Sequence, residues 1–204
     1  MEKIDYKKEL KHLYKTSAKK AEVAAIPKMN FLMVDGEGDP NTAQTFQDAI
    51  EVLYQLSYAL KFMIKKSEIS IDYGVLPLEG LWWSDDMSSF SVEKKSEWKW
   101  TLMIMQPELV TKKMVQEAME QVKTKKNPPS LPLVRFESFE EGEAAQIMHV
   151  GPFSEEGPTI EKLHAFIESS RKERKGKHHE IYLSDIRRAA PEKWKTIIRQ
   201  PIKN

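Results

Sequence analysis

The pattern of apolar and polar positions predicts strands and amphipathic helices in a regular order. Residues 29–34 form an apolar run typical of a strand, which a glycine-containing turn ends. Residues 42–65 carry apolar side chains at helical spacing and predict a long amphipathic helix. Residues 73–83 and 98–106 are rich in aromatic and branched side chains, which favour strands. The first half of the chain is therefore predicted to fold as strand, helix, strand, strand.

The second half of the chain is predicted to repeat this order. Residues 133–139 and 144–150 predict a hairpin around Glu140-Glu141-Gly142. A helix with one apolar face follows, and strands at 180–184 and 196–199 complete the half. The apolar residues of that helix are Ile160, Leu163, Phe166 and Ile167.

One nine-residue segment occurs twice in the chain. Residues 99–107 read Lys-Trp-Thr-Leu-Met-Ile-Met-Gln-Pro, and residues 193–201 read Lys-Trp-Lys-Thr-Ile-Ile-Arg-Gln-Pro. Both copies begin with Lys-Trp and end with Gln-Pro after an apolar run, so each predicts a strand that stops at its proline. We therefore expect two related modules, with a pocket at the seam between them.

The domain boundaries that we expect follow from this repeat. Residues 1–26 carry seven lysines and few large apolar side chains, which predicts a peripheral N-terminal arm. Residues 27–204 are expected to form one α+β domain with an antiparallel sheet and helices packed on one side. Within it, module one spans about 27–107, a connecting helix 108–126, and module two about 132–202.

Composition narrows the class of protein and of partner. The 32 basic and 31 acidic residues nearly cancel, so we expect no direct nucleic-acid binding. No apolar run approaches a membrane span of about 18 to 20 residues, and the N-terminus lacks the apolar core of a signal peptide. The chain has no cysteine, which excludes disulfides and suits the cytoplasm. The five histidines lack metal-ligand spacing, so neither a metal nor a cofactor is expected.

The strongest candidate for chemistry lies in the predicted strand 180–184. Strand alternation puts Glu180, Tyr182 and Ser184 on one face. In an aromatic cleft, burial would raise the pKa of Glu180, whereas a cationic ligand would lower it. Such a carboxylate can bind a cation or act as a base. The alternative is a half-exposed strand residue that pairs with a nearby Lys177 or Arg187.

Five further residues are candidate ligand contacts, each with a plainer structural alternative. Glu79 occupies the comparable strand of the first half but equally suits a surface position. Tyr73, Trp83 and Trp100 offer aromatic faces for flat or cationic ligands, and core packing is the alternative for each. His149 is a polar candidate that could instead stabilise a turn.

Four strings of residues resemble a known family. They are Ile-Pro-Lys-Met-Asn-Phe at 26–31, Pro-Leu-Glu-Gly-Leu-Trp-Trp at 77–83, Gln-Ile-Met-His-Val-Gly-Pro-Phe at 146–153 and Glu-Ile-Tyr-Leu-Ser-Asp at 180–185. Over residues 26–202 the chain resembles stand-alone GyrI-like small-molecule binding proteins, relatives of the effector-binding domains of multidrug-sensing regulators.

The resemblance implies a fold and a ligand class. Two strand-helix-strand-strand modules would be related by a pseudo-twofold axis, with an aromatic pocket between them. Glu180 matches the pocket carboxylate that receives amphipathic, aromatic, cationic or electrophilic small molecules.

The resemblance also implies two alternative functions. One is a hydrolase that opens strained cyclopropane rings of DNA-alkylating natural products, in which Glu180 would polarise a water and Tyr182 would orient the carboxylate or donate to the developing anion. The other is a protein-interaction module that modulates a regulator or a gyrase.

Overall fold

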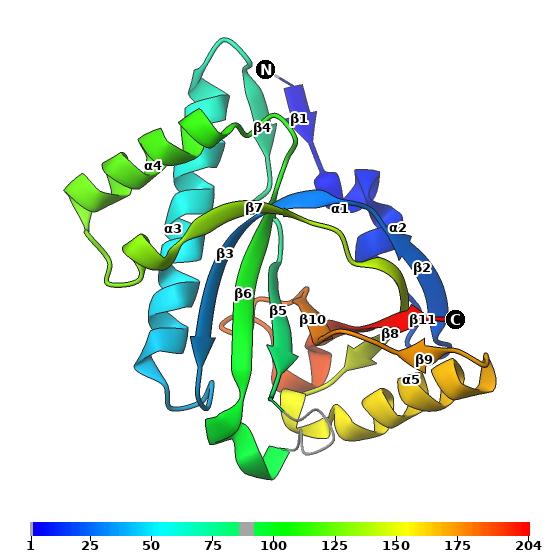
Figure 1. The fold of residues 1–204 in the computed structure, drawn as a ribbon. Coiled ribbons are helices and arrows are strands. Elements are labelled where there is room, and N and C mark those ends of the chain that lie inside the picture. Colours follow the sequence, from blue (N-terminus) through cyan, green and yellow to red (C-terminus); the bar gives the residue numbers. More distant parts are fainter. Residues whose placement is uncertain (1, 86–91) are drawn as a thin grey trace. The chain divides into compact units, whose positions relative to one another are not determined.

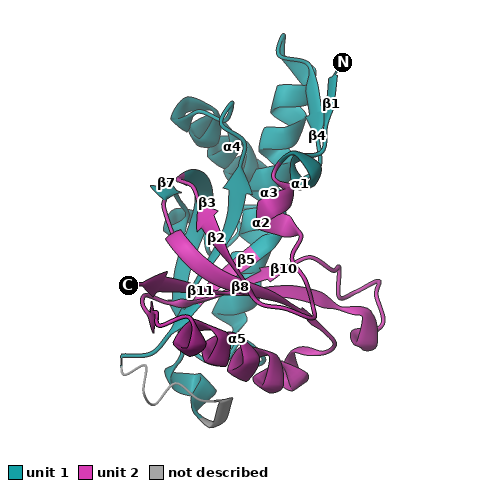
Figure 2. Cartoon of the chain, turned by 90° about the vertical axis from the view of Figure 1, so that its right-hand side faces the viewer, with its two compact units in different colours: residues 1–9, 29–78, 82–139 teal, residues 10–28, 79–81, 140–204 magenta. Residues whose placement is uncertain are grey.

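The computed structural model describes residues 2–85 and 92–204, which form two compact units (Figure 1, Figure 2). Each unit combines helices with mainly antiparallel strand pairs, so the α+β class predicted from the sequence is confirmed. Each unit is assembled from three separate stretches of the chain. Unit 1 consists of Met1–Glu9, Met29–Leu78 and Trp82–Phe139, and unit 2 consists of Leu10–Lys28, Glu79–Leu81 and Glu140–Asn204.

Unit 1 contains the predicted series of strand, helix, strand and strand, formed by β3, α3, β5 and β6. β6 pairs antiparallel with β3 over eight residues, and α3 packs against both strands. β1 and β4 form a separate parallel pair. The elements are β1 (Glu2–Ile4), α1 (Tyr6–Glu9), β3 (Met29–Glu37), α3 (Gln44–Lys66), β4 (Ile71–Tyr73), β5 (Leu78–Trp83), β6 (Lys99–Gln106), α4 (Lys112–Lys125) and β7 (Arg135–Phe139), with 3₁₀ turns at Val92–Glu97 and Leu131–Leu133.

Unit 2 contains the same series in β8, α5, β10 and β11, and it also receives the middle residues of β5. β11 is its central strand, because it pairs antiparallel with β8 on one side and β10 on the other. The elements are α2 (Lys11–Tyr14), β2 (Glu22–Ile26), β8 (Gly142–Val150), α5 (Gly157–Ser169), β9 (Glu173–Arg174), β10 (His178–Tyr182) and β11 (Lys195–Lys203), with 3₁₀ turns at Phe153–Glu155 and Pro191–Lys193.

The strands of the two series follow the same order. In unit 1, β6 lies between β3 and β5, and in unit 2, β11 lies between β8 and β10. The first strand of each series also pairs with one extra strand, β7 on β3 and β2 on β8. The two copies of the nine-residue segment are thus the middle strands β6 and β11, which confirms that the sequence repeat is a repeat of the fold.

The helix of unit 2 packs as its apolar spacing predicts. Leu163 and Ile167 of α5 are fully buried against Ala145 and Ile147 of β8 and Ile198 of β11. Their neighbours on the same helix face, Ile160 and Phe166, pack at the edge of this cluster. α5 therefore covers one face of the sheet of unit 2, and the residues of that face are fixed by strand alternation.

Several predicted elements differ in their extent, and the strand expected over residues 73–83 forms as two strands, β4 and β5. The helix expected from residue 108 begins at Lys112, because Thr111 caps it through a hydrogen bond from Met114 N to Thr111 Oγ1 of 3.2 Å. The strand expected to stop at Pro201 continues to Lys203. Pro201 lies opposite Ala144 in the sheet, and its carbonyl accepts a hydrogen bond from the backbone N–H of Lys175 at 2.9 Å.

The predicted hairpin of residues 133–150 is wrong. β7 pairs with β3 in unit 1, whereas β8 pairs with β2 and β11 in unit 2. The polar turn at residues 140–142 therefore connects the two units. Alternation of apolar and polar residues predicts that a segment forms a strand, but it does not identify the strand with which that segment pairs.

The N-terminal segment contributes more than the expected peripheral arm. β2 pairs antiparallel with β8, and Leu13 and Tyr14 of α2 are buried. The lysines of this segment are exposed, whereas a few of its apolar side chains are buried. The average composition of the segment does not reveal these few buried positions. No helix in the described part of the chain is both long and apolar enough to cross a bilayer.

The packing of α5 predicts a clear difference between two isoleucines. Ile198→Ala should lower the free energy of unfolding by about 2–5 kcal/mol, because it leaves a cavity in a fully buried cluster. Ile186→Ala, at a half-exposed position, should change it by less than about 0.5 kcal/mol. Urea denaturation followed by circular dichroism measures both. Equal effects would contradict the packing described.

Candidate functional site

Alternation along β10 separates two groups of polar side chains in unit 2. His178, Glu180 and Tyr182 point to the face that α5 covers, and His179 points to the opposite face. Glu180 and Tyr182 thus share a face as predicted. Ser184 lies beyond the end of β10, and its Oγ accepts a hydrogen bond from Lys195 N.

Glu180 is held by hydrogen bonds from both of its neighbours on that face. Tyr182 Oη donates to Glu180 Oε2 at 2.8 Å, and His178 Nε2 lies 2.9 Å from Glu180 Oε1. The Glu180 side chain is only 14% exposed. Burial raises the pKa of Glu180, but the hydrogen bonds from His178 and Tyr182 outweigh burial and lower it. The structure therefore favours a buried carboxylate here.

A second carboxyl group lies beside Glu180. Glu156 directly precedes α5, and it is 6% exposed. Burial and the negative charge of Glu180 raise the pKa of Glu156 to about 9. Thr196 of β11, directly opposite Tyr182, lies next to Glu156. We call Glu156, His178, Glu180, Tyr182 and Thr196 the Glu180 site.

Three aromatic rings adjoin this site. The Phe153 ring lies 5.6 Å from that of Tyr182 and 5.1 Å from that of Trp194, between ring centroids. Trp194 Nε1 donates to the carbonyl of Ala189 at 2.8 Å, which fixes its indole. Phe153 is 39% exposed, so one face of the aromatic group meets solvent.

His149 stabilises the turn that leads from β8 to α5. Its Nδ1 is 2.9 Å from Thr159 Oγ1, and its Nε2 is 3.2 Å from the carbonyl of Pro152. Gly151 has a φ of +139°, and a Cβ there would lie 3.3 Å from His149 Nε2. His149 is buried on the same face as Thr196, its partner in the strand register.

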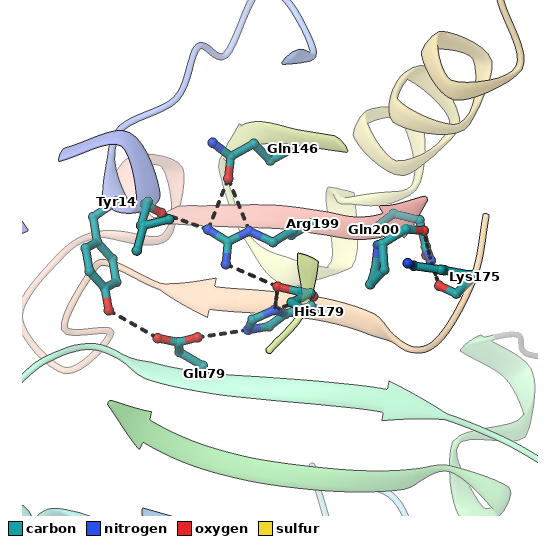
Figure 3. A network of polar contacts seen from close by, with 10 residues as sticks. Tyr14, Glu79, Gln146, Lys175, His179, Arg199 and Gln200 are labelled. Atoms are coloured by element: carbon teal, nitrogen blue, oxygen red, sulfur yellow. Dashed lines mark hydrogen bonds and ion pairs between the residues drawn. The ribbon is translucent and has the colours of Figure 1, made fainter. Parts of the chain in front are cut away.

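The opposite face of the same sheet carries a separate buried polar network (Figure 3). His179 Nε2 donates to Glu79 Oε2 and His179 Nδ1 donates to Glu141 Oε1, both at 2.9 Å. Arg199 lies opposite His179 in the register, and Gln146 lies opposite Arg199. The buried polar network consists of Tyr14, Glu79, Glu141, Gln146, His179 and Arg199.

The charges of this network balance each other. Burial lowers the pKa of His179, but Glu141 and Glu79 outweigh it and raise the pKa to about 9. Burial raises the pKa of Glu141, but His179 and Arg199 outweigh it and lower that pKa. Arg199 also donates to Gln146 Oε1 at 3.0 Å and to the carbonyl of Leu13 at 2.9 Å. The network thus holds two carboxylates and two cations.

The predicted site residues are distributed over both units. Within unit 2, Glu180 and Tyr182 are in direct contact, whereas Glu79 belongs to the network on the other face. Tyr73, Trp83 and Trp100 belong to unit 1. Whether these three contact a ligand stays a prediction.

The aromatic candidates of unit 1 are mostly buried. The Tyr73 ring packs against Tyr6, and burial raises the pKa of Tyr73. Trp100 packs edge-on to Phe46, and a Cβ at Gly36 would overlap with its ring. Trp83 is partly exposed.

Three residues of the Glu180 site were not among the candidates. His178 could have been found, because it continues the alternation of Glu180 and Tyr182. Glu156 and Thr196 carry no local signal, since each reaches Glu180 only through the packing of α5 and β11. Within residues 2–85 and 92–204, no group of three or more histidines or acidic residues is arranged to hold a metal ion.

A surface hollow elsewhere has no connection to these residues. It encloses about 320 Å³ on α4, far along the chain from β10. None of the predicted site residues lines it. The hollow is lined by Glu120, Gln121, Thr124 and Lys125.

Comparison with known proteins agrees with this fold. Residues 20–203 match the family described as the GyrI-like small molecule binding domain. An uncharacterized conserved protein from Listeria innocua is 43% identical, with a TM-score of 0.91 over 98% of this chain and 100% of that chain. A hydrolase encoded by lin2189 from the same organism is 42% identical, with a TM-score of 0.88 over 99% and 100%.

One further solved structure shows a more distant likeness. The EcmrR C-terminal domain is 12% identical, with a TM-score of 0.58 over 91% of this chain and 98% of that chain, which shows a shared fold. A search of curated proteins found no match.

The buried polar network predicts a specific dependence of stability on pH. The folded-state pKa of His179 is raised to about 9, so its stabilising contribution is complete below about pH 6.5 and is lost as pH rises through about 9. His179→Gln should therefore destabilise the protein most at pH 6, by about 3–5 kcal/mol. At pH 9.5 the free energies of unfolding of wild type and His179→Gln should lie closer together than at pH 6, by up to about 3 kcal/mol.

Urea denaturation at pH 6, 7.5 and 9.5 measures this difference. His12→Gln, a change at an exposed histidine, is the matched control and should show no such trend. If His179→Gln lowers the free energy of unfolding by the same amount at all three pH values, His179 is not a buried imidazolium.

Proposed function

Because this chain belongs to the GyrI-like small molecule binding domain family, we propose that its ligand binds at the Glu180 site of unit 2. The ligand class that we propose is an aromatic or amphipathic small molecule with a positive or electrophilic centre. Glu180 would contact that centre, and the neighbouring rings would contact the rest of the molecule.

One observation carries the proposal: a mostly buried carboxylate beside a group of aromatic rings. Glu180 accepts hydrogen bonds at 2.8 and 2.9 Å that keep it ionised, although its side chain is only 14% exposed. A desolvated carboxylate attracts a cation strongly, and aromatic faces attract cations through their quadrupoles. Phe153 is exposed enough to be reached from solvent.

The surrounding residues have separable roles in this proposal. Tyr182 and His178 hold the Glu180 carboxylate in place, so it needs little reorganisation when a ligand arrives. Phe153 and Trp194 supply the flat apolar surface. The near balance of 32 basic and 31 acidic residues favours a small molecule over a nucleic acid as the partner.

A second candidate function is hydrolysis. The chain is 42% identical over nearly its whole length to a protein described as a hydrolase. In that case Glu180 would remove a proton from a water molecule, whose oxygen attacks the strained carbon of the substrate. The electron pair of the broken ring bond would move to the adjoining conjugated group, which is then protonated. Substrate and one water would give the ring-opened alcohol.

Capture of a cation predicts a charge-specific effect of Glu180. Glu180→Gln should weaken binding of the permanently cationic N-methylquinolinium about 10- to 100-fold, because a charge-assisted contact contributes about 1.5–3 kcal/mol. Binding of neutral quinoline at pH 8 should change less than threefold. Isothermal titration calorimetry measures both affinities.

Glu161→Gln, a change on the exposed face of α5, is the matched control and should bind both probes as wild type does. Equal loss of the cationic and neutral probes in Glu180→Gln would show that the substitution perturbs the site rather than its charge.

Hydrolysis predicts loss of turnover without loss of binding. Wild type should convert a cyclopropane-containing DNA alkylator to its ring-opened product, and Glu180→Gln should slow this by at least about 100-fold because the base is absent. Mass spectrometry detects the added water. No product from wild type would remove the hydrolase candidate and leave capture as the function.

A further inference from the structure

Two buried carboxyl groups meet where α5 begins. Glu156 is 6% exposed and the Glu180 side chain is 14% exposed. The two groups are close enough to hydrogen-bond to each other. A carboxylate can only accept, so a hydrogen bond between two carboxyl groups requires that one of them carries a proton.

The hydrogen bonds around the pair decide which group carries that proton. Tyr182 and His178 both bind Glu180, which stabilises its ionised form. The hydrogen bond that the Thr196 side chain makes to Glu156 also favours an ionised group, but burial outweighs it. Burial and the charge of Glu180 raise the pKa of Glu156 to about 9, so the proton resides on Glu156 at neutral pH.

The Thr196 hydroxyl lies beside the pair. Thr196 is 1% exposed, and it lies on the face of Glu180 and Tyr182, next to Glu156. A ligand that reaches Glu156 would therefore also meet this hydroxyl.

The elements packed around the pair carry other groups that titrate or bear charge. His149 is engaged by Thr159 and Pro152 O, and His164 is hydrogen-bonded to Arg174. Burial, followed by the charges of Arg174 and His178, lowers the pKa of His164 to about 4. The groups concerned are His149 on β8, Glu155 before α5, Glu161 and His164 on α5, Arg174 on β9, and His178 and Tyr182 on β10.

We propose that Glu156 and Glu180 together hold one proton when the site is empty and exchange it for the positive charge of a bound cation. This inference rests on the proposed function, since it requires that cations bind at Glu180. A cation beside both groups offsets the repulsion that two carboxylates would otherwise feel, so the proton leaves Glu156 for solvent. The ionised Glu156 then faces the positive charge of the ligand. A neutral ligand leaves the proton in place.

The exchange has a thermodynamic signature. If one proton leaves for each cation bound, the affinity for the cation rises about tenfold per pH unit wherever Glu156 is protonated in the empty site. From pH 6 to 8 the Kd should therefore fall by about 100-fold, because both values lie below the pKa of Glu156. The affinity for a neutral ligand should not follow this slope.

Calorimetry of the full chain with N-methylquinolinium, at pH 6, 7 and 8 and in two buffers of different ionisation enthalpy, tests the exchange. Wild type should release about one proton per cation and show the fall in Kd. Glu156→Gln should still bind the cation and release no proton. Its Kd should differ by less than about threefold between pH 6 and pH 8. Glu155→Gln, an exposed neighbour, should behave as wild type.

Infrared spectroscopy of the empty site provides a second measurement that needs no ligand. Wild type at pH 7 should show the carbonyl stretch of a buried protonated carboxyl, and Glu156→Gln should lack it. Adding N-methylquinolinium to wild type should remove the band.

The contrary outcomes are distinct. Binding by wild type without proton release, or proton release that persists in Glu156→Gln and so comes from another group, would overturn the exchange alone. The absence of the protonated carboxyl band would overturn it regardless of affinity. If wild type binds neither N-methylquinolinium nor quinoline, the proposed function is overturned as well.

Discussion

Unit 2 depends on the pairing of the charges that its sheet buries. His179 lies between Glu79 and Glu141, and Arg199 is bound by Gln146 of β8 and by Glu141, which directly precedes β8. A buried charge without a partner costs several kcal/mol, so these groups are stable only as a set. Their hydrogen bonds join β5, β10, β11, β8 and α2, and they therefore determine how the segments of the unit assemble (Figure 3).

The two faces of β10 show the same residue types in two different arrangements. In the buried polar network, two carboxylates meet two cations, and none of its side chains has a buried nitrogen or oxygen without a partner. At the Glu180 site, by contrast, two carboxyl groups adjoin each other. The buried polar network is complete without a ligand. At the Glu180 site an added positive charge would offset the repulsion between the two carboxyl groups.

The relatives do not choose between capture and catalysis. Proteins with 42–43% identity over nearly the whole chain include one described as a hydrolase and one without a characterised activity. Glu180 suits both functions, because a desolvated carboxylate attracts a cation and also removes protons from water. Under the proposed function, the chemical nature of the ligand would decide between the two, since hydrolysis needs an electrophilic carbon that water can attack.

The sequence alone determined the elements and their repetition. The paired Lys-Trp to Gln-Pro segments became β6 and β11, and the spacing of Leu163 and Ile167 gave the buried face of α5, because both patterns are local and periodic. Alternation likewise predicted that Glu180 and Tyr182 share a face. Which side chains contact Glu180 and His179 was decided by the tertiary structure alone. Glu156 and Thr196 reach Glu180, and Glu79 reaches His179, through contacts between segments distant in the chain, which no local pattern encodes.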